Sequence, residues 1–378
     1  MKIVMATKYY PPVIGGIESH VRDLSEALVE AGHQVRVICS NTEHRLVQEV
    51  INGVEIVRLP RITEQAATPI ARHFGEVLNH EAQHSDIIHF HFPYPWGEFQ
   101  WIFERLRRHV PYVVTYHTDI VRQKTALKMY RPFLNRFLDK AALIMASSPN
   151  LIEYSDFLAL RAQNCRHVDF GLNLDHIADN AEAIKRAKQL KADFSTDRPI
   201  VLFAGRLVYY KGVDVLIDSM PLVDAEYVVI GSGPLEEEMR QRAEALGVSD
   251  RLHMLGRASD EDLAAWYHAA DVFVLPSVEP SEAFGLVQIE AHAAGTPVVS
   301  TRLRSGVPYA NLDAQTGYTV DVGDPVALAE GINKLLDDPA EAARLGAQAK
   351  ERALTQFSIP AMVDHVTEVY EEALAAHG

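Results

Sequence analysis

Short apolar runs and amphipathic segments alternate along the first half of this chain. The apolar runs that have the length of a buried strand are residues 2–7, 34–40, 86–92, 111–117 and 143–148. The segment after the first run has helical spacing, because Val21, Leu24 and Leu28 lie on one side of it. The helical patterns cover residues 16–33 and 127–142. This half of the chain therefore predicts alternating strands and helices.

A second series of strand-like runs begins near residue 198. Its members are residues 198–206, 225–233, 251–257, 271–277 and 296–301. The intervening residues 172–198 are helical and charged, and we interpret them as the connection between two domains. Strand–helix alternation predicts a doubly wound parallel sheet. Since 378 residues are too many for one ordinary core, we expect an α/β protein with two Rossmann-like domains.

The composition is that of a soluble globular protein, with 48% hydrophobic and 23% charged residues. No apolar run reaches the roughly 18–20 residues of a membrane-spanning helix, and the N-terminal residues do not resemble a secretory signal. Cys39 and Cys165 fit neither a disulfide framework nor a metal-ligand spacing, so a cytoplasmic location is expected. The net charge of −15 argues against nucleic-acid binding, which needs clustered cations.

Unusual residues follow the strands, where open α/β sheets bind their ligands. Gly15 and Gly16 come after the first strand and open a helix, whose N–H groups and dipole can hold an anion. The same pair can also serve as a simple tight turn. Arg206 and Lys211 come after the strand that ends at Gly205, and two such cations suit a diphosphate. The alternative is a pair of solvated loop cations.

Two glutamates flank a glycine-containing loop after another strand-like run. We expect Glu282 in the loop at the carboxyl end of that strand and Glu290 on the second turn of the next helix. Between them lie the amides of Ala283, Phe284 and Gly285. One carboxylate can accept sugar hydroxyls, the amides can hold phosphates and the second carboxylate can hold a ribose diol. This arrangement suits a nucleotide sugar better than two solvated surface acids.

Other chemistry fits the residues less well. No glycine-rich stretch, including residues 231–236, completes the G-x-G-x-x-G fingerprint of dinucleotide-binding dehydrogenases. His89 and His91 share a strand face, but the sequence shows no third metal ligand, so packing or lining of the site is favoured over a metal pair. Asp119 is not part of an Asp-x-Asp metal motif. No metal is therefore expected.

Five motifs occur in the order and at the distances typical of one enzyme family: "GGIE", "YHTD", "GRLVYYKG", "EAFGLVQIE" and "AHAAGTPVV". Together they resemble a retaining glycosyltransferase of the GT-B fold, family 4 (GT4). The resemblance runs from residue 1 to about 355. Within the family, the sequence is most similar to bacterial transferases that build mannose- or rhamnose-containing O-antigen chains.

The resemblance implies a role for each matching position. His117 would contact the transferred sugar, Arg206 and Lys211 would bind the diphosphate, Glu282 would hold sugar hydroxyls, and Glu290 would hold the ribose. The other positions implied to line the donor site are Gly15, Gly16, Gly205, Gly231, Gly233, Gly256, Arg257, Ala283, Phe284, Gly285 and Leu286. The resemblance favours mannose from GDP-mannose over GDP-rhamnose and over UDP-sugars. Transfer would form an α-linkage without a metal or other cofactor.

The resemblance also implies that the two domains bind different substrates. Residues 1–172 would form an acceptor-side domain, with a C-terminal helix at 358–378 packed back on it, and residues 173–357 would bind the nucleotide-sugar donor. The acceptor would be a glycan or a molecule linked to polyprenyl diphosphate. The chain departs from the family at 169–176, where Asn173 replaces the usual acid of the interdomain turn. That departure concerns the hinge rather than the chemistry.

A cationic stretch with apolar neighbours lies between residues 105 and 140 of this otherwise acidic protein. Its cations are Arg105, Arg107, Arg108, Arg122, Lys124, Lys128, Arg131, Arg136 and Lys140. Such a face could lie on anionic lipid at the inner face of the cytoplasmic membrane, or it could be a solvated helix face. Two other functions stay open: a nucleotide-sugar epimerase of similar shape, and a catalytically silent nucleotide-sugar-binding subunit.

Overall fold

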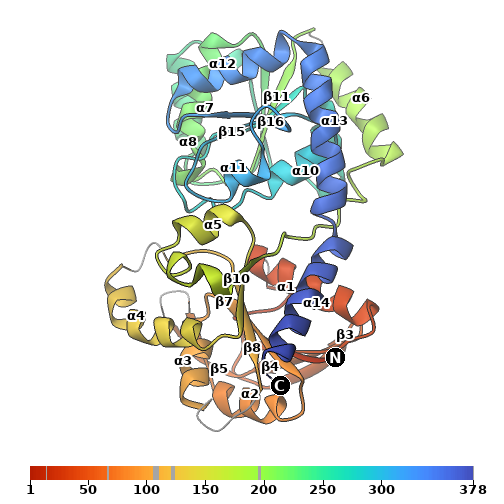
Figure 1. The fold of residues 1–378 in the computed structure, drawn as a ribbon. Coiled ribbons are helices and arrows are strands. Elements are labelled where there is room, and N and C mark those ends of the chain that lie inside the picture. The colour runs from red at the N-terminus through yellow and green to blue at the C-terminus, as the bar shows by residue number, and fades with distance from the viewer. Residues whose placement is uncertain (14, 66–67, 105–109, 121–123, 195–196, 378) are drawn as a thin grey trace. The chain divides into compact units, whose positions relative to one another are not determined.

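The computed structural model describes residues 1–13, 15–65, 68–104, 110–120, 124–194 and 197–377 (Figure 1). The chain divides into two compact units. The first contains Met1–Leu172 and Ile359–Gly378, and the second contains Asn173–Ser358. Each unit has its own sheet and its own hydrophobic core.

An eight-stranded sheet in the order β10-β9-β8-β7-β1-β2-β4-β3 forms the centre of the first unit. Its strands are β1 (Lys2–Ala6), β2 (Gln34–Ser40), β3 (Val47–Ile51), β4 (Val54–Leu59), β7 (Ile87–Phe92), β8 (Tyr112–Tyr116), β9 (Leu143–Ala146) and β10 (Cys165–His167). All neighbours pair in parallel except β3, which is antiparallel to β4. A separate hairpin joins β5 (Arg61–Gln65) to β6 (Thr68–Ala71). The helices are α1 (Gly16–Glu30), α2 (Phe74–Ala82), α3 (Pro95–Glu104), α4 (Lys124–Asp139), α5 (Pro149–Tyr154) and α14 (Ile359–Ala375).

A six-stranded parallel sheet in the order β13-β12-β11-β14-β15-β16 forms the centre of the second unit. Its strands are β11 (Ile200–Ala204), β12 (Glu226–Ile230), β13 (Leu252–Gly256), β14 (Val272–Leu275), β15 (Val298–Thr301) and β16 (Gly317–Val320). The helices are α6 (Ala181–Asp193), α7 (Val213–Ser219), α8 (Glu236–Ala245), α9 (Asp260–Ala269), α10 (Val287–Ala293), α11 (Val307–Ala310), α12 (Pro325–Leu336) and α13 (Pro339–Gln356).

The apolar runs read from the sequence are the buried strands of these sheets. Every residue of β11 and of β14 is buried, which is typical of parallel strands covered by helices on both faces. In the first unit, alternate residues of β1 enter two different core clusters, with Val4 in one and Ile3 and Met5 in the other. The predicted class, α/β with two Rossmann-like parallel sheets, is confirmed.

The C-terminal helix α14 belongs to the first unit and packs beside its sheet (Figure 1). The hydroxyl of Tyr370 lies 2.7 Å from Nδ1 of His89 in β7. A Cβ on Gly171 would lie 2.8 Å from the Cα of Ile359, so glycine allows the start of this helix to approach the chain closely.

Two local predictions are corrected by the structure. The segment 172–198 is not a simple connection, because its helix α6 packs against α9 and is part of the second unit. The ion pair between Lys191 Nζ and Asp271 Oδ1, at 2.8 Å, also joins this helix to that unit. Helix α10 begins at Val287, so Glu290 lies on its first turn rather than on its second.

The structure adds β3 to β6, between residues 47 and 71, and also β10 and β16, to the strands predicted from the sequence. β3 is an edge strand whose residues alternate between half-buried and exposed, so it has no continuous apolar run. β5 is largely exposed and charged. None of the described helices has the length and apolar character that crossing a membrane requires.

Candidate functional site

Three predicted glycines stand at the carboxyl ends of neighbouring strands in the second unit. Gly205 follows β11, Gly231 follows β12 and Gly256 ends β13. The N–H of Gly205 donates to the carbonyl of Ile230 at 2.9 Å, and that of Gly231 donates to Gly256 at 2.6 Å. A Cβ on Gly231 would lie 1.8 Å from the carbonyl oxygen of Gly205, and its φ is +139°. Only glycine therefore allows these strand ends to come together.

The next turn continues the same edge of the sheet. A Cβ on Gly233 would lie 2.2 Å from the carbonyl oxygen of Leu207, whose N–H donates to Ser232 at 3.1 Å. The Arg257 Nε donates to the Ser232 hydroxyl at 3.2 Å. The structure thus gathers at one sheet edge the predicted residues Gly205, Gly231, Gly233, Gly256 and Arg257.

The backbone carries Lys211 from the end of β11 to the loop after β14. Lys211 ends a short 3-10 turn and is followed by Gly212, whose φ of +65° turns the chain. A Cβ on Gly212 would lie 2.0 Å from the carbonyl oxygen of Pro276 in that loop. The N–H of Val278 donates to the carbonyl of Tyr210 at 2.8 Å and holds the two segments together.

This turn joins two of the predicted site residues in an ion pair. Lys211 Nζ lies 2.5 Å from Oε2 of Glu282, and both residues are only 8% exposed. The Ser277 hydroxyl donates to the same carboxylate oxygen at 3.2 Å. A buried cation and a buried carboxylate therefore lie side by side at the carboxyl end of the sheet.

The second predicted cation has a different environment. Arg206 follows Gly205 directly and is exposed. Among the residues that the structure describes, no carboxylate forms an ion pair with it. Its charge is therefore available to an anion that approaches this edge, whereas the charge of Lys211 is shared with Glu282.

Glu290 lies apart from that ion pair, on α10. The hydroxyl of Tyr267, on α9, donates to its Oε2 at 2.6 Å. Burial raises the pKa of Glu290, and the hydrogen bond from Tyr267 partly opposes the rise. A buried carboxylate oriented by one hydroxyl can accept further hydroxyls, as a ribose would require.

The loop between the glutamates is held by packing. The ring of Phe284 is buried against those of Phe357 and Tyr309, with centroids 5.8 and 6.2 Å away. Gly285 has a φ of +74°, and a Cβ there would lie 2.5 Å from Leu275 Cδ2. Ala283 accepts from the N–H of Gly306 at 2.7 Å, and Leu286 caps α10.

The remaining predicted residues lie in the first unit. Gly15 is the N-cap of α1 and offers no side-chain cap, and Gly16 is exposed with open space where a Cβ would stand. His117 follows β8, and its N–H donates to the carbonyl of Phe92 at 3.2 Å. Its imidazole is buried, and burial holds its pKa well below the usual value.

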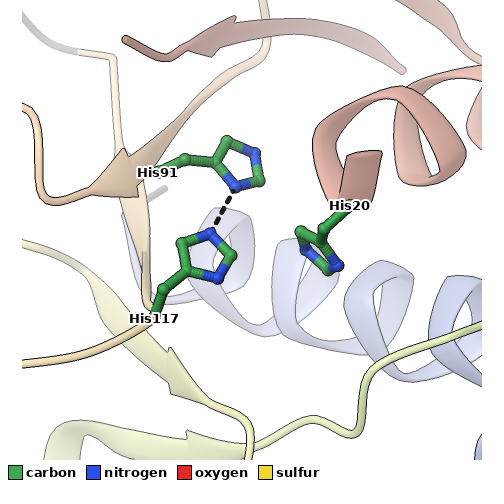
Figure 2. Close-up of side chains that lie close together, drawn as sticks. All are labelled: His20, His91 and His117. Atoms are coloured by element: carbon green, nitrogen blue, oxygen red, sulfur yellow. Dashed lines mark hydrogen bonds between the residues drawn. The ribbon is translucent and has the colours of Figure 1, made fainter. Parts of the chain in front are cut away.

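His117 belongs to a group of buried histidines (Figure 2). Its Nε2 lies 3.2 Å from Nδ1 of His91 in β7, and its ring centroid lies 5.1 Å from that of His20 in α1. His20 is not among the residues predicted from the sequence, although its place inside an amphipathic helix that covers the sheet was a usable signal. Burial lowers the pKa of His20 to about 4, and burial with the neighbouring histidines holds that of His91 well below its usual value. These imidazoles are neutral at pH 7.

His89 has a supporting role beside this group. Its Nε2 lies 2.6 Å from the Thr115 hydroxyl, and its Nδ1 lies 2.7 Å from the Tyr370 hydroxyl. Both ring nitrogens therefore have partners within the fold. Burial lowers the pKa of His89 to about 3.

Two family models match the chain, one for each half. The model described as "Glycosyltransferase Family 4" matches residues 14–175, and the one described as "Glycosyl transferases group 1" matches residues 184–352. The D-rhamnosyltransferase WbpZ of Pseudomonas aeruginosa is 32% identical over 93% of this chain and 90% of its own length. The O-antigen chain mannosyltransferase C of Escherichia coli is 28% identical over 97% of this chain and 96% of its own length.

Solved structures have the same fold. The sucrose-phosphate synthase of Thermosynechococcus elongatus is similar with a TM-score of 0.77 and 26% identity, and 99% of each chain is covered. The Anabaena protein HepE in complex with UDP is similar with a TM-score of 0.77, over 98% of this chain and all of its own. Its identity of 20% supports the fold alone.

Proposed function

This chain belongs to the group 1 and family 4 glycosyltransferases, and on that premise we propose that it transfers a hexose, mannose from GDP-mannose, to a lipid-linked or oligosaccharide acceptor of a bacterial surface polysaccharide. The observation that carries the proposal is the buried pair of Lys211 and Glu282, 2.5 Å apart. A nucleotide sugar presents a diphosphate directly beside sugar hydroxyls. Such a ligand needs a cation next to a carboxylate.

In this proposal, cationic groups and backbone amides bind the diphosphate of the donor. Lys211 and the exposed Arg206 would hold it, with the amides of the Ala283–Leu286 loop. Fixed positive groups stabilise the negative charge that develops on the departing nucleotide. Because protein groups supply this charge, we expect transfer to need no metal. Glu290 would bind the ribose and Glu282 the hydroxyls of the sugar.

The transfer step exchanges one bond at the anomeric carbon for another. The bond to the diphosphate oxygen breaks, and the acceptor hydroxyl oxygen bonds to the carbon on the same face, so that configuration is retained. The hydroxyl proton passes to the departing GDP or to solvent. His117, a neutral imidazole, would accept or donate a hydrogen bond to the sugar near this carbon. The first unit would hold the acceptor.

The relatives support mannose or rhamnose as the transferred sugar. One is named a D-rhamnosyltransferase and another an O-antigen chain mannosyltransferase. GDP-rhamnose and UDP-sugars remain as the alternative donors. The membership in a transferase family favours acceptor-dependent transfer over epimerisation and over a silent binding subunit. Release of nucleoside diphosphate only in the presence of an acceptor would separate these functions.

A thermal-shift panel tests the donor. A ligand that binds only the folded protein stabilises it by RT ln(1 + [L]/Kd), which is about 2.7 kcal/mol at a hundredfold excess over Kd. We expect GDP to raise the melting temperature and UDP, ADP and TDP to leave it unchanged, and GDP-mannose to be used when sugars are compared. A shift with UDP and none with GDP would overturn the mannose assignment and leave the family intact.

We also propose peripheral contact of the first unit with anionic membrane. Phe103 and Met129, on α3 and α4, are 54% and 78% exposed, and Phe133 packs beside Phe99 with ring centroids 5.3 Å apart. Exposed cations on or directly after α4 are Lys128, Arg131, Arg136 and Lys140. Arg105, Arg107, Arg108 and Arg122 lie outside the described residues, as does the side chain of Lys124. Apolar and cationic groups on one surface suit an anionic bilayer.

Sedimentation with phosphatidylglycerol vesicles tests this contact. Met129→Ser and Phe103→Ser should each weaken binding about tenfold, since burying one large apolar side chain is worth about 1.5–3 kcal/mol. Val326→Ser, at an exposed apolar position of the second unit, is the matched control and should bind normally. Equal binding by all three variants would contradict the proposal.

A further inference from the structure

Three histidines from distant parts of the chain meet in the first unit. His20 comes from α1, His91 from β7 and His117 from the end of β8, and we call them the histidine cluster (Figure 2). One ring nitrogen of each lies within 4.8 Å of those of the other two. Within the described part of the chain, no other three histidine, cysteine or acidic side chains meet in this way.

Some ring nitrogens of the histidine cluster have no partner among the described residues. Both ring nitrogens of His20 and the Nε2 of His91 are buried, and no described residue bonds to them. A buried polar atom without a hydrogen bond costs about 1–3 kcal/mol, so such atoms are rare in folded proteins. A bound ion would give the His20 ring a partner, because one ring nitrogen of His20 lies within 4.8 Å of ring nitrogens of His91 and His117.

The spacing of the nitrogens suits a small transition-metal ion. Two imidazole nitrogens on a tetrahedral Zn²⁺, each about 2.0–2.1 Å from the metal, lie about 3.4 Å apart. His91 Nδ1 and His117 Nε2 are already 3.2 Å apart. The hydrogen now shared by these two atoms would move to the second nitrogen of its ring. The ring of His20 must move closer, and the rings of His91 and His117 must turn so that these two nitrogens point at one ion.

The surroundings of the histidine cluster support such a site. The ring of His89 lies against that of His91, with centroids 4.2 Å apart and the planes tilted by 32°, and its own nitrogens are held by Thr115 and Tyr370. It therefore orients a ligand without being one. Neutral imidazoles without carboxylates favour Zn²⁺, Co²⁺ or Cu²⁺ over Mg²⁺ and Ca²⁺, which prefer oxygen ligands.

We propose that the histidine cluster binds one divalent transition-metal ion, with Zn²⁺ as the reference, through one nitrogen each of His20, His91 and His117. Three protein ligands leave the fourth tetrahedral position to water. The ion would occupy the imidazole of His117. The proposed function needs that imidazole at the sugar. On that basis, the ion is an inhibitor of transfer and not a cofactor.

Titration of the metal-free, full-length protein with Co²⁺ tests the site without any donor or acceptor. Tetrahedral Co²⁺ absorbs strongly in the visible range, and we expect saturation at one equivalent and displacement by Zn²⁺. His20→Ala should weaken binding by more than about 100-fold, since loss of an outer-shell partner alone costs about 10–100-fold. Because no described residue bonds to the His20 ring nitrogens, this variant should fold. His20→Gln keeps more of the volume and repeats the measurement.

The matched control removes an exposed histidine pair of the same unit. His80 and His84 have ring centroids 5.4 Å apart on the surface, where adventitious metal binding is common. His80→Ala/His84→Ala should keep the visible band and the affinity. Absence of the band in the wild type, unchanged binding in folded His20→Ala, or loss of binding in the control would each overturn the proposal.

Transfer assays then separate this proposal from the proposed function. We expect stoichiometric Zn²⁺ to inhibit transfer and a chelator to restore full activity. Binding of Co²⁺ without inhibition would support the metal site and contradict the placement of His117 at the sugar. Activity abolished by a chelator and restored by metal would overturn the inhibitory role.

Discussion

Replacing Lys211 with methionine is expected to lower the rate of sugar transfer by about 10²–10³-fold, the usual cost of removing one fixed group that stabilises developing negative charge. The Lys211 ammonium is buried beside Glu282 at the carboxyl end of β11 and β14. A charge in such surroundings acts more strongly than one in water. The measurement is kcat/KM for donor at saturating acceptor.

Stability must be separated from catalysis in this variant. Removing one partner of a buried ion pair costs about 3–5 kcal/mol, because the other charge is left alone. The double variant Lys211→Met/Glu282→Gln should therefore recover much of the lost stability while transfer stays low. Lys350→Met is the control, since that lysine pairs with Asp179 at 2.7 Å on the surface of the second unit. A wild-type rate of transfer by the Lys211→Met variant would show that the diphosphate binds elsewhere.

Substitutions of the two glutamates are expected to have different effects on GDP binding and on transfer. Glu290→Ala should weaken the binding of GDP alone by about 1–3 kcal/mol, the value of a charged hydrogen bond to the ribose. Glu282→Gln should leave GDP affinity unchanged or raise it, because the charge of Lys211 is then free for the diphosphate. The same variant should lower kcat, since its carboxylate no longer holds the sugar hydroxyls.

Calorimetry with GDP and steady-state kinetics together distinguish these outcomes. Glu236→Ala is a suitable control, because Glu236 is on the surface helix α8 and pairs with Arg240 at 3.1 Å. It should change neither GDP affinity nor kcat. If Glu282→Gln loses GDP affinity while Glu290→Ala keeps it, the donor lies in the reverse direction along the loop.

The predictions that the structure corrects concern boundaries and edges. The sequence prediction placed Glu290 one turn too far along its helix, because the spacing of apolar residues does not show at which residue the helix begins after the loop. The edge strand β3 was missed because every second side chain is exposed to solvent and can be polar, so the strand has no continuous apolar run. The charged helix α6 was read as a connection, although its few apolar residues pack against α9.

The sequence by itself determined most strands of the two sheets, since buried parallel strands require continuous apolar runs and the helices between them require a 3.6-residue period. It also determined where the glycines and charged residues follow the strands, because that order is local. Only the tertiary structure decided that Lys211 and Glu282 form a pair and that His20 joins His91 and His117. The physical reason is that these contacts depend on which strands are neighbours and how helices cover them. No local pattern of side chains contains that information.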